Sequence, residues 1–192
     1  MNNNLLIIGA GIYGLVAKDV AESMGCFERI VFADDSTTEN QNGTPVVGTV
    51  NDLNPLSKEF ANVVVAIGSP VVRQAMLDRI KAESLMRIAT LVSSRVHVSP
   101  SAHIGAGCFI EPMAVVHTGC ALEKGCLICA GGVVNHASLC DDCVQVDCNA
   151  TIAGDTVVLG CIKIPSGTVY QNKKPHGSIP FDGREYSFED GM

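Results

Sequence analysis

A repeat of period six in the second half of the chain constrains the fold more than any other feature. Every sixth residue from Val98 is apolar over twelve consecutive positions, and eleven of them are aliphatic: Val98, Ile104, Ile110, Val116, Leu122, Ile128, Val134, Cys140, Val146, Ile152, Val158 and Ile164. The residue two places earlier is usually small, a pattern typical of a left-handed parallel β-helix built from hexapeptides. Three hexapeptides make one triangular coil, so the repeat predicts about four coils stacked roughly 4.8 Å apart.

The first half of the chain alternates apolar strands with helical segments. Strands are expected at residues 5–8, 30–33, 63–67 and 87–92, with a short one at 45–47, and helices at 15–24 and 71–82. This alternation predicts βαβ units and a parallel sheet. The expected fold class is therefore α/β plus β: a small Rossmann-like domain at 1–92, the β-helix at 93–170 and an irregular tail at 171–192.

A glycine-rich turn follows the first expected strand. Gly9, Gly11 and Gly14 form the pattern G-x-G-x-x-G before a helix, and Asp34 lies twenty residues past Gly14. Such a turn lets the backbone approach a phosphate, and the acid at this spacing binds a ribose. The alternative is a tight turn that only packs helix on strand. Because a complete NAD domain needs two such halves, a smaller nucleotide moiety is favoured over NAD.

Composition excludes several classes of protein. Apolar residues make up 47% of the chain, which is enough for a sizeable core. The formal charge is −7, with 13 basic and 20 acidic residues, so a nucleic-acid partner is not expected. We find neither an apolar run near ~20 residues nor a basic leader segment, so we expect no membrane span and a cytoplasmic location.

The nine cysteines allow two interpretations. Without an export signal they are expected to be reduced. The pairs Cys126/Cys129 and Cys140/Cys143 have the C-x-x-C spacing of zinc ligands. However, Cys140 occupies an inward position of the repeat and Cys126 a small position, so packed thiols are favoured.

The five histidines predict no metal site. A β-helix metal centre needs three converging imidazoles, whereas only His117 and His136 lie near each other, 19 residues apart and therefore on adjacent coils. Imidazole changes its charge near pH 6.5, so a single histidine can serve as a general base (its pKa is about 6.5 in model peptides).

The chain resembles the bacterial sugar acyltransferases of the NeuD/PglD type over roughly residues 4–165. The residues that carry the resemblance are the glycine turn with Leu15-Val16, the segments Phe32-Ala33-Asp34-Asp35 and Val65-Ala66-Ile67-Gly68, Arg73, and Val134-Asn135-His136. The resemblance implies acetyl-CoA-dependent transfer to an amino or hydroxyl group of a sugar, here expected to be a UDP-amino sugar used in surface-glycan biosynthesis. It also implies a homotrimer with active sites between subunits.

The resemblance also implies roles for particular residues. His136 would be the general base, and the amide of Gly154, one coil above it, the oxyanion donor. Asn135 is expected to contact the substrate. The nucleotide would lie against the first turn and its surroundings: Gly9, Gly11, Tyr13, Gly14, Asp34, Asp35 and Gly68.

Several positions depart from the family pattern. Tyr13 stands where a histidine is common, and Ala137 where an acid often orients the base; Asp155, one coil above Ala137, could substitute. The β-helix is short, and Lys173 and Lys174 could pair with CoA phosphates. These departures keep alternatives open: a catalytically weakened relative that binds a nucleotide sugar as a binding or assembly subunit, another hexapeptide acyltransferase or a metal β-helix enzyme, and an NAD-dependent redox protein.

Overall fold

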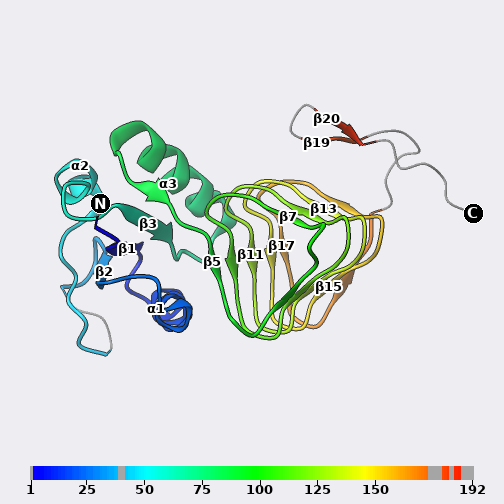
Figure 1. Cartoon of the computed structure of the whole chain (residues 1–192), viewed down its shortest axis with the longest axis horizontal. Coiled ribbons are helices and arrows are strands. Elements are labelled where there is room, and N and C mark those ends of the chain that lie inside the picture. Colours follow the sequence, from blue (N-terminus) through cyan, green and yellow to red (C-terminus); the bar gives the residue numbers. More distant parts are fainter. Residues whose placement is uncertain (1, 39–41, 173–178, 182–183, 187–192) are drawn as a thin grey trace, which may run out of the picture.

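The computed structural model describes residues 2–38, 42–172, 179–181 and 184–186, and it shows an α/β domain followed by a triangular β-helix (Figure 1). The sheet of the first domain contains β1 (Leu5–Ile8), β2 (Ile30–Ala33), β3 (Asn62–Val65) and β4 (Arg87–Ile88). The strands are parallel in the order β2-β1-β3-β4. The expected Rossmann-like arrangement is therefore present.

Both faces of this sheet are buried, as in other parallel sheets. Leu5 and Ile7 of β1 pack in one cluster with α1 (Ile12–Met24), whereas Leu6 and Ile8 pack on the opposite face with α3 (Pro70–Glu83) and α2 (Leu53–Leu56). A 3-10 helix, η1 (Val50–Asp52), precedes α2. The strand expected at 45–47 is reduced to a single bridge between Val46 and Phe32.

The second domain is a left-handed β-helix of fourteen two-residue strands. They are β5 (Leu91–Val92), β6 (His97–Val98), β7 (His103–Ile104), β8 (Phe109–Ile110), β9 (Val115–Val116), β10 (Ala121–Leu122), β11 (Leu127–Ile128), β12 (Val133–Val134), β13 (Leu139–Cys140), β14 (Gln145–Val146), β15 (Thr151–Ile152), β16 (Val157–Val158), β17 (Lys163–Ile164) and β18 (Val169–Tyr170). They form three parallel sheets whose paired residues are 18 apart, as Phe109 and Leu127 are. The period-six prediction is confirmed.

The interior of the β-helix contains the residues that the repeat selects. Ten of its twelve positions, from Ile110 to Ile164, are buried, and the first two are half-buried. Cys126 and Cys140 lie in this core, and the Cys126 thiol donates to the carbonyl of Asp141. None of the nine cysteines, all of which are described, forms a disulfide. The packed-thiol interpretation of this pair therefore fits better than the zinc one.

The β-helix extends beyond the predicted run at both ends. The strand expected at 87–92 is divided: β4 belongs to the α/β sheet, whereas β5 pairs with β8 of the β-helix. Val92 and Tyr170 lie six residues outside the predicted run, in phase with it, and both pack against the core. The domains therefore meet between Ile88 and Leu91. The tail, expected to be irregular, contains the antiparallel strands β19 (Ile179–Phe181) and β20 (Arg184–Tyr186).

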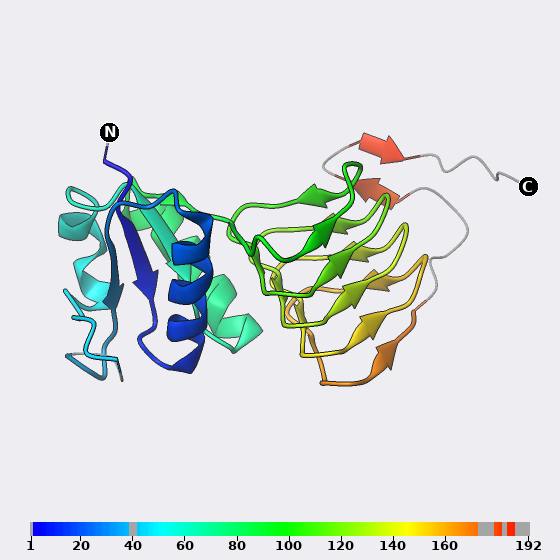
Figure 2. The same ribbon diagram turned by 60° about the horizontal axis from the view of Figure 1, so that its bottom comes forward.

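A buried arginine fixes one domain against the other, and Figure 2 shows the two domains side by side. Arg73 of α3 donates to the carbonyl oxygens of Gly125 (2.8 Å) and Cys143 (2.9 Å) in the β-helix and of Ile67 (2.8 Å) after β3. Burial lowers the pKa of Arg73, but hydrogen bonds to several carbonyls satisfy its donors. In the described part of the chain, every helix is too short or too polar to cross a membrane.

Candidate functional site

The glycine turn requires glycine at Gly9 and Gly14 but leaves Gly11 open. Gly9 has φ +103°, and a Cβ there would lie 3.0 Å from the carbonyl oxygen of Ala66. A Cβ on Gly14 would overlap the carbonyl oxygen of Gly9, so only glycine allows α1 to pack so closely on β1. At Gly11, by contrast, a Cβ would meet no atom within 4 Å. The middle of the turn is therefore open on the side from which a ligand would approach.

Asp34 and Asp35 each hold a loop of the α/β domain through hydrogen bonds. Asp34 accepts hydrogen bonds from the N–H of Ala10 (2.8 Å) and from Ser36. Burial alone would raise the pKa of Asp34, but these hydrogen bonds lower it, so the carboxylate is charged at neutral pH. Asp35 accepts from the N–H of Val50 at 2.9 Å. Both carboxylates therefore hold loops in place, and they do so beside the turn.

Tyr13 connects the glycine turn to the β-helix. Its ring covers Gly68, where a Cβ would lie 2.8 Å from the Cε2 atom of the tyrosine. The Nε2 of Gln145 in β14 donates to the tyrosine hydroxyl at 3.2 Å. The pKa of the Tyr13 hydroxyl is raised, and burial is the largest cause. The expected substrate-binding residues Gly9, Gly11, Tyr13, Gly14, Asp34 and Gly68 are thus brought together at the carboxyl ends of β1, β2 and β3, where α/β sheets bind ligands.

His136 follows β12 and is exposed. The Oδ1 atom of Asn135 accepts the backbone N–H of His136 at 2.8 Å and lies 2.9 Å from its Nδ1 atom. An amide oxygen can only accept, so this contact favours the tautomer with the proton on Nδ1. This tautomer leaves a lone pair on Nε2, which is the form that a general base requires.

Gly154 lies one coil above His136, as expected. A Cβ on Gly154 would lie 2.5 Å from Cε1 and 2.7 Å from Nε2 of His136, so the ring rests against a position that only glycine leaves open. Within the described residues, the N–H of Gly154 makes no hydrogen bond to another group of the protein. The imidazole ring therefore lies against the α-carbon of Gly154, next to an amide that has no hydrogen-bond partner among the described residues.

Other expectations for this region are changed by the structure. The residue that holds the His136 ring is Asn135, not Asp155, whose backbone N–H donates to the carbonyl of His136. His117 lies one coil below His136 and one position aside, as the spacing of 19 residues predicts, and its N–H donates to the carbonyl of Val134. The spacing of 18 identified Gly154, whereas no periodicity indicated the contact between Asn135 and the ring. Lys173 and Lys174 lie outside the described residues.

The turn and the histidine occupy different corners of the prism. Tyr13 reaches Gln145 in β14, one strand of the sheet that also contains β8 and β11, whereas His136 follows β12 of the next sheet. One chain therefore does not bring its nucleotide-type turn and its candidate base into a single pocket.

Comparison with known proteins agrees with this architecture. Residues 4–80 match the model of the PglD N-terminal domain. The acetyltransferase domain of PglB from Neisseria gonorrhoeae FA1090 is 29% identical, with a TM-score of 0.76 over 92% of this chain and 95% of that one. The same domain in complex with acetyl coenzyme A is 28% identical, with a TM-score of 0.77 over 93% of this chain and 95% of that one.

A more distant structure shares the fold. A mutant of perosamine N-acetyltransferase from Caulobacter crescentus, in complex with CoA and GDP-perosamine, is 17% identical and has a TM-score of 0.76 over 97% of both chains. The domain match over residues 4–80, the shared fold and the order of the two domains support the resemblance to the hexapeptide-repeat sugar acyltransferases of the NeuD/PglD type.

Proposed function

We propose that this protein transfers the acetyl group of acetyl-CoA to an amino group of a nucleotide-linked sugar, with His136 as the general base. The observation that carries the proposal is the imidazole of His136, oriented by Asn135 and resting against Gly154. The complexes of the structural relatives, one with acetyl coenzyme A and one with CoA and GDP-perosamine, support this choice of substrates.

The residues of this site supply what an acyl transfer needs. Nε2 of His136 takes the proton of the amine as its nitrogen attacks the carbonyl carbon of the thioester. The N–H of Gly154 then stabilises the negative charge on the tetrahedral oxygen, a contribution of roughly 3–4 kcal/mol for one such donor. The intermediate collapses by breaking the carbon–sulfur bond, and the imidazolium returns the proton to the departing sulfur. No covalent enzyme intermediate is required, since the thiolate is a good leaving group.

Asn135 acts as a positioning residue in this mechanism. Its Oδ1 atom holds the Nδ1 proton, so the free lone pair of the ring remains on the side of Gly154. It thereby takes the place of the acid that often follows the base in this family and is Ala137 here. Its contact with the ring supports a positioning role in place of the substrate contact that the sequence suggested.

The nucleotide is proposed to bind at the turn from Gly9 to Gly14. The open middle of the turn and the N-terminus of α1 suit a diphosphate even in a chain of net charge −7, because backbone N–H groups make the contacts. We retain a UDP-linked amino sugar as the proposed acceptor and treat a GDP-linked one as the competing outcome.

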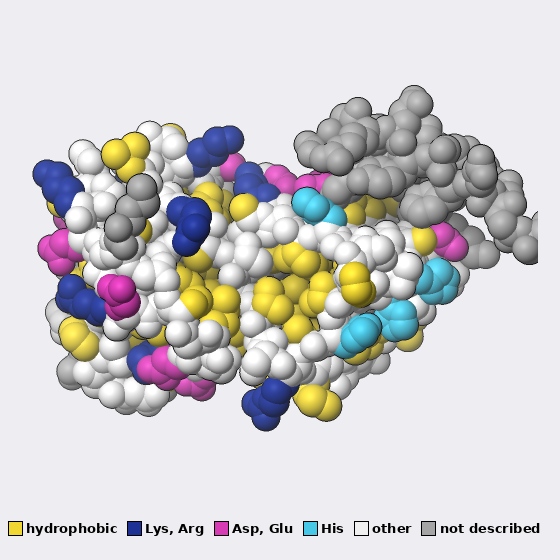
Figure 3. All heavy atoms as spheres, viewed as in Figure 1, with side chains coloured by type: hydrophobic (Ala, Val, Ile, Leu, Met, Phe, Trp, Pro, Cys, Tyr) yellow, Lys and Arg dark blue, Asp and Glu magenta, His cyan; other side chains and the backbone are white. Residues whose placement is uncertain are grey.

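A trimer would complete the active site. The base and the nucleotide turn of one chain lie at different corners of the prism, so a neighbouring copy can bring its His136 to this chain's turn. Apolar side chains stand exposed on the β-helix, among them Met113 (70% exposed) and Leu159 (61%), as association would require. Figure 3 shows histidine side chains along one side of the β-helix, beside apolar surface.

The decisive experiment follows thiol release from acetyl-CoA with a panel of UDP- and GDP-amino sugars. We expect turnover with a UDP-amino sugar, and a loss of kcat of roughly 10²–10⁴-fold in His136→Ala with little change in substrate affinity. His117→Ala is the matched control and should keep normal turnover. Equal, near-wild-type rates in both variants would remove histidine catalysis. Ligand binding in thermal-shift assays without turnover would favour the weakened, binding-protein alternative.

A further inference from the structure

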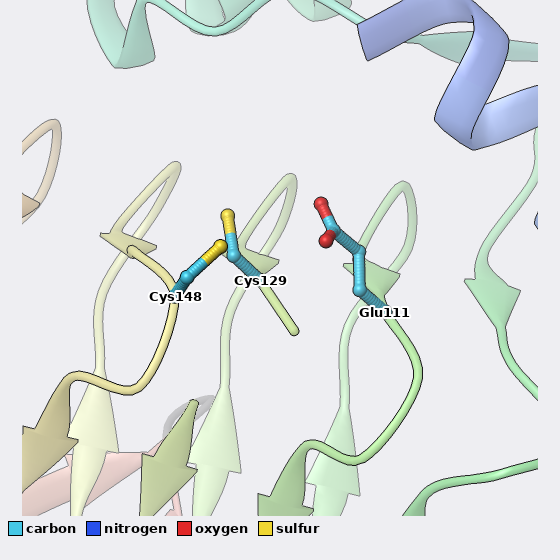
Figure 4. A group of neighbouring side chains, drawn as sticks. All are labelled: Glu111, Cys129 and Cys148. Carbon is cyan, nitrogen blue, oxygen red and sulfur yellow. The ribbon is translucent and has the colours of Figure 1, made fainter. Parts of the chain in front are cut away.

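Three side chains outside the proposed transfer machinery converge at one corner of the β-helix: Glu111, Cys129 and Cys148 (Figure 4). One carboxylate oxygen and the two sulfur atoms all lie within 4.8 Å of one another. Glu111 and Cys129 are buried, whereas Cys148 is exposed. Among the described residues, no other group of three histidine, cysteine or acidic side chains comes this close in a geometry that could hold a metal ion.

The β-helix itself produces this convergence. Glu111 directly follows β8, Cys129 directly follows β11, and Cys148 lies two residues after β14. Because β8, β11 and β14 are neighbours in one sheet, the three residues stand on successive coils at the same corner. The stacking of coils therefore repeats the position of each of these turns from one coil to the next.

The cluster offers one carboxylate oxygen and two sulfur atoms as metal ligands, and its surroundings carry excess negative charge. The N–H of Ala130 donates to Oε2 of Glu111 at 3.0 Å, which fixes the carboxylate, and the Cys129 thiol interacts with the same carboxylate. The Cys129 thiol donates to Oδ1 of Asp147 at 3.8 Å, and Asp147 in turn pairs with Lys163 at 3.2 Å. Lys163 is the one cationic side chain in these contacts, and it is already paired with Asp147.

Burial makes the charged forms of this cluster costly. Glu111 and Cys129 are both buried, so an uncompensated negative charge on either side chain would be unfavourable. A bound cation would remove that cost, because it replaces the protons and neutralises the carboxylate and thiolates together.

We propose that Glu111, Cys129 and Cys148 form a binding site for a thiophilic divalent cation, with Zn²⁺ as the ion to test. Two thiolates and one carboxylate are a donor set that zinc accepts, and three protein ligands leave a fourth position for water. On binding, the thiols of Cys129 and Cys148 each release a proton to solvent as their sulfur atoms bond to the ion. The exposed side of Cys148 gives the ion a path of entry.

This site differs from the C-x-x-C pairs considered above. It uses Cys129 but neither Cys126 nor Cys140, which remain in the core. Neither His136 nor the glycine turn supplies a ligand, but the Cys129 thiol interacts with the Tyr13 hydroxyl, so the test measures ion binding directly rather than turnover.

The test uses full-length protein that has been reduced and freed of metal. Zn²⁺ is titrated in competition with a chromophoric chelator, and Co²⁺ in a parallel titration reports thiolate ligation through its charge-transfer absorption. We expect one ion per chain, a thiolate–cobalt band, and release of protons on binding. Cys148→Ser should weaken zinc binding at least 10-fold and reduce the cobalt band. Because Cys148 is exposed, this variant should fold normally.

Two further variants keep the result interpretable. Cys26→Ser removes another exposed cysteine, which follows α1 in the α/β domain, and should bind zinc as the wild type does. Glu111→Gln keeps the shape of the side chain and should also weaken binding. Failure of the wild type to bind one ion, or equal binding in Cys148→Ser and wild type, would overturn the proposal. So would seven rather than nine titratable thiols in the unreduced, denatured protein, with a Cys129–Cys148 disulfide found by peptide mapping.

Discussion

Replacing Gly154 with alanine tests the geometry of the proposed active site more sharply than removing the base. The new Cβ would lie 2.5 Å from Cε1 of His136, whereas carbon atoms at optimal contact are about 3.5–4.0 Å apart, so the ring must retreat by roughly 1 Å. The backbone at residue 154 does not have positive φ, and alanine can adopt its conformation. Since the ring is exposed and can swing outward, unfolding free energy should change by less than about 0.5 kcal/mol.

The catalytic cost should be much larger than the cost in stability. A misplacement of about 1 Å in a catalytic group can reduce the rate on the order of 100-fold, so we expect Gly154→Ala to lose about that factor in kcat. Turnover is measured by release of the CoA thiol, and stability by urea unfolding. In a His136→Ala background, Gly154→Ala should cause little further loss, because both changes act through the same ring. Normal kcat in the single variant, or an undiminished additional loss in the double variant, would refute the proposed contact.

Four other outcomes follow from the same structure. Asn135→Ala should lower kcat while leaving KM nearly unchanged, and Asn135→Asp should restore much of the rate; a change confined to KM would return Asn135 to a substrate-binding role. Ile128→Asp should prevent soluble expression, since it places an unpaired charge in the β-helix core, and recovery of a folded variant would contradict that reading. Because hydrogen bonds lower the pKa of Asp34 in the folded state, its stabilisation is present above about pH 4 and is lost as the pH falls through the lowered value; Asp34→Asn should therefore cost more unfolding free energy at pH 7 than at pH 3. Light scattering should give a mass of about 60 kDa, three times 20.2 kDa, and a value near the monomer mass would rule out the trimer.

The interior of each domain could be read from local patterns. The period-six positions from Ile110 to Ile164 are buried because each coil repeats the same geometry, so one residue in six always points inward. The glycine turn could also be predicted from the sequence, because φ +103° at Gly9 and the close approach at Gly14 exclude other residues. Val92, just before the expected start of the β-helix, and Tyr170, at its expected end, carry the same phase.

Contacts between coils and between domains could not be predicted in this way, because they depend on side-chain rotamers and on how the domains dock. Nothing in the sequence indicated that Oδ1 of Asn135 would hold the His136 ring, since one-residue neighbours can point in many directions. Docking through Arg73 turned Tyr13 toward Gln145, and the stacking of coils brought Glu111, Cys129 and Cys148 together although 37 residues separate the first from the last. The sequence alone determined the fold and the glycine turn, because they follow from backbone periodicity and glycine conformations. Tertiary structure decided which side chains meet, because only packing selects one rotamer and one partner from the many that the chain permits.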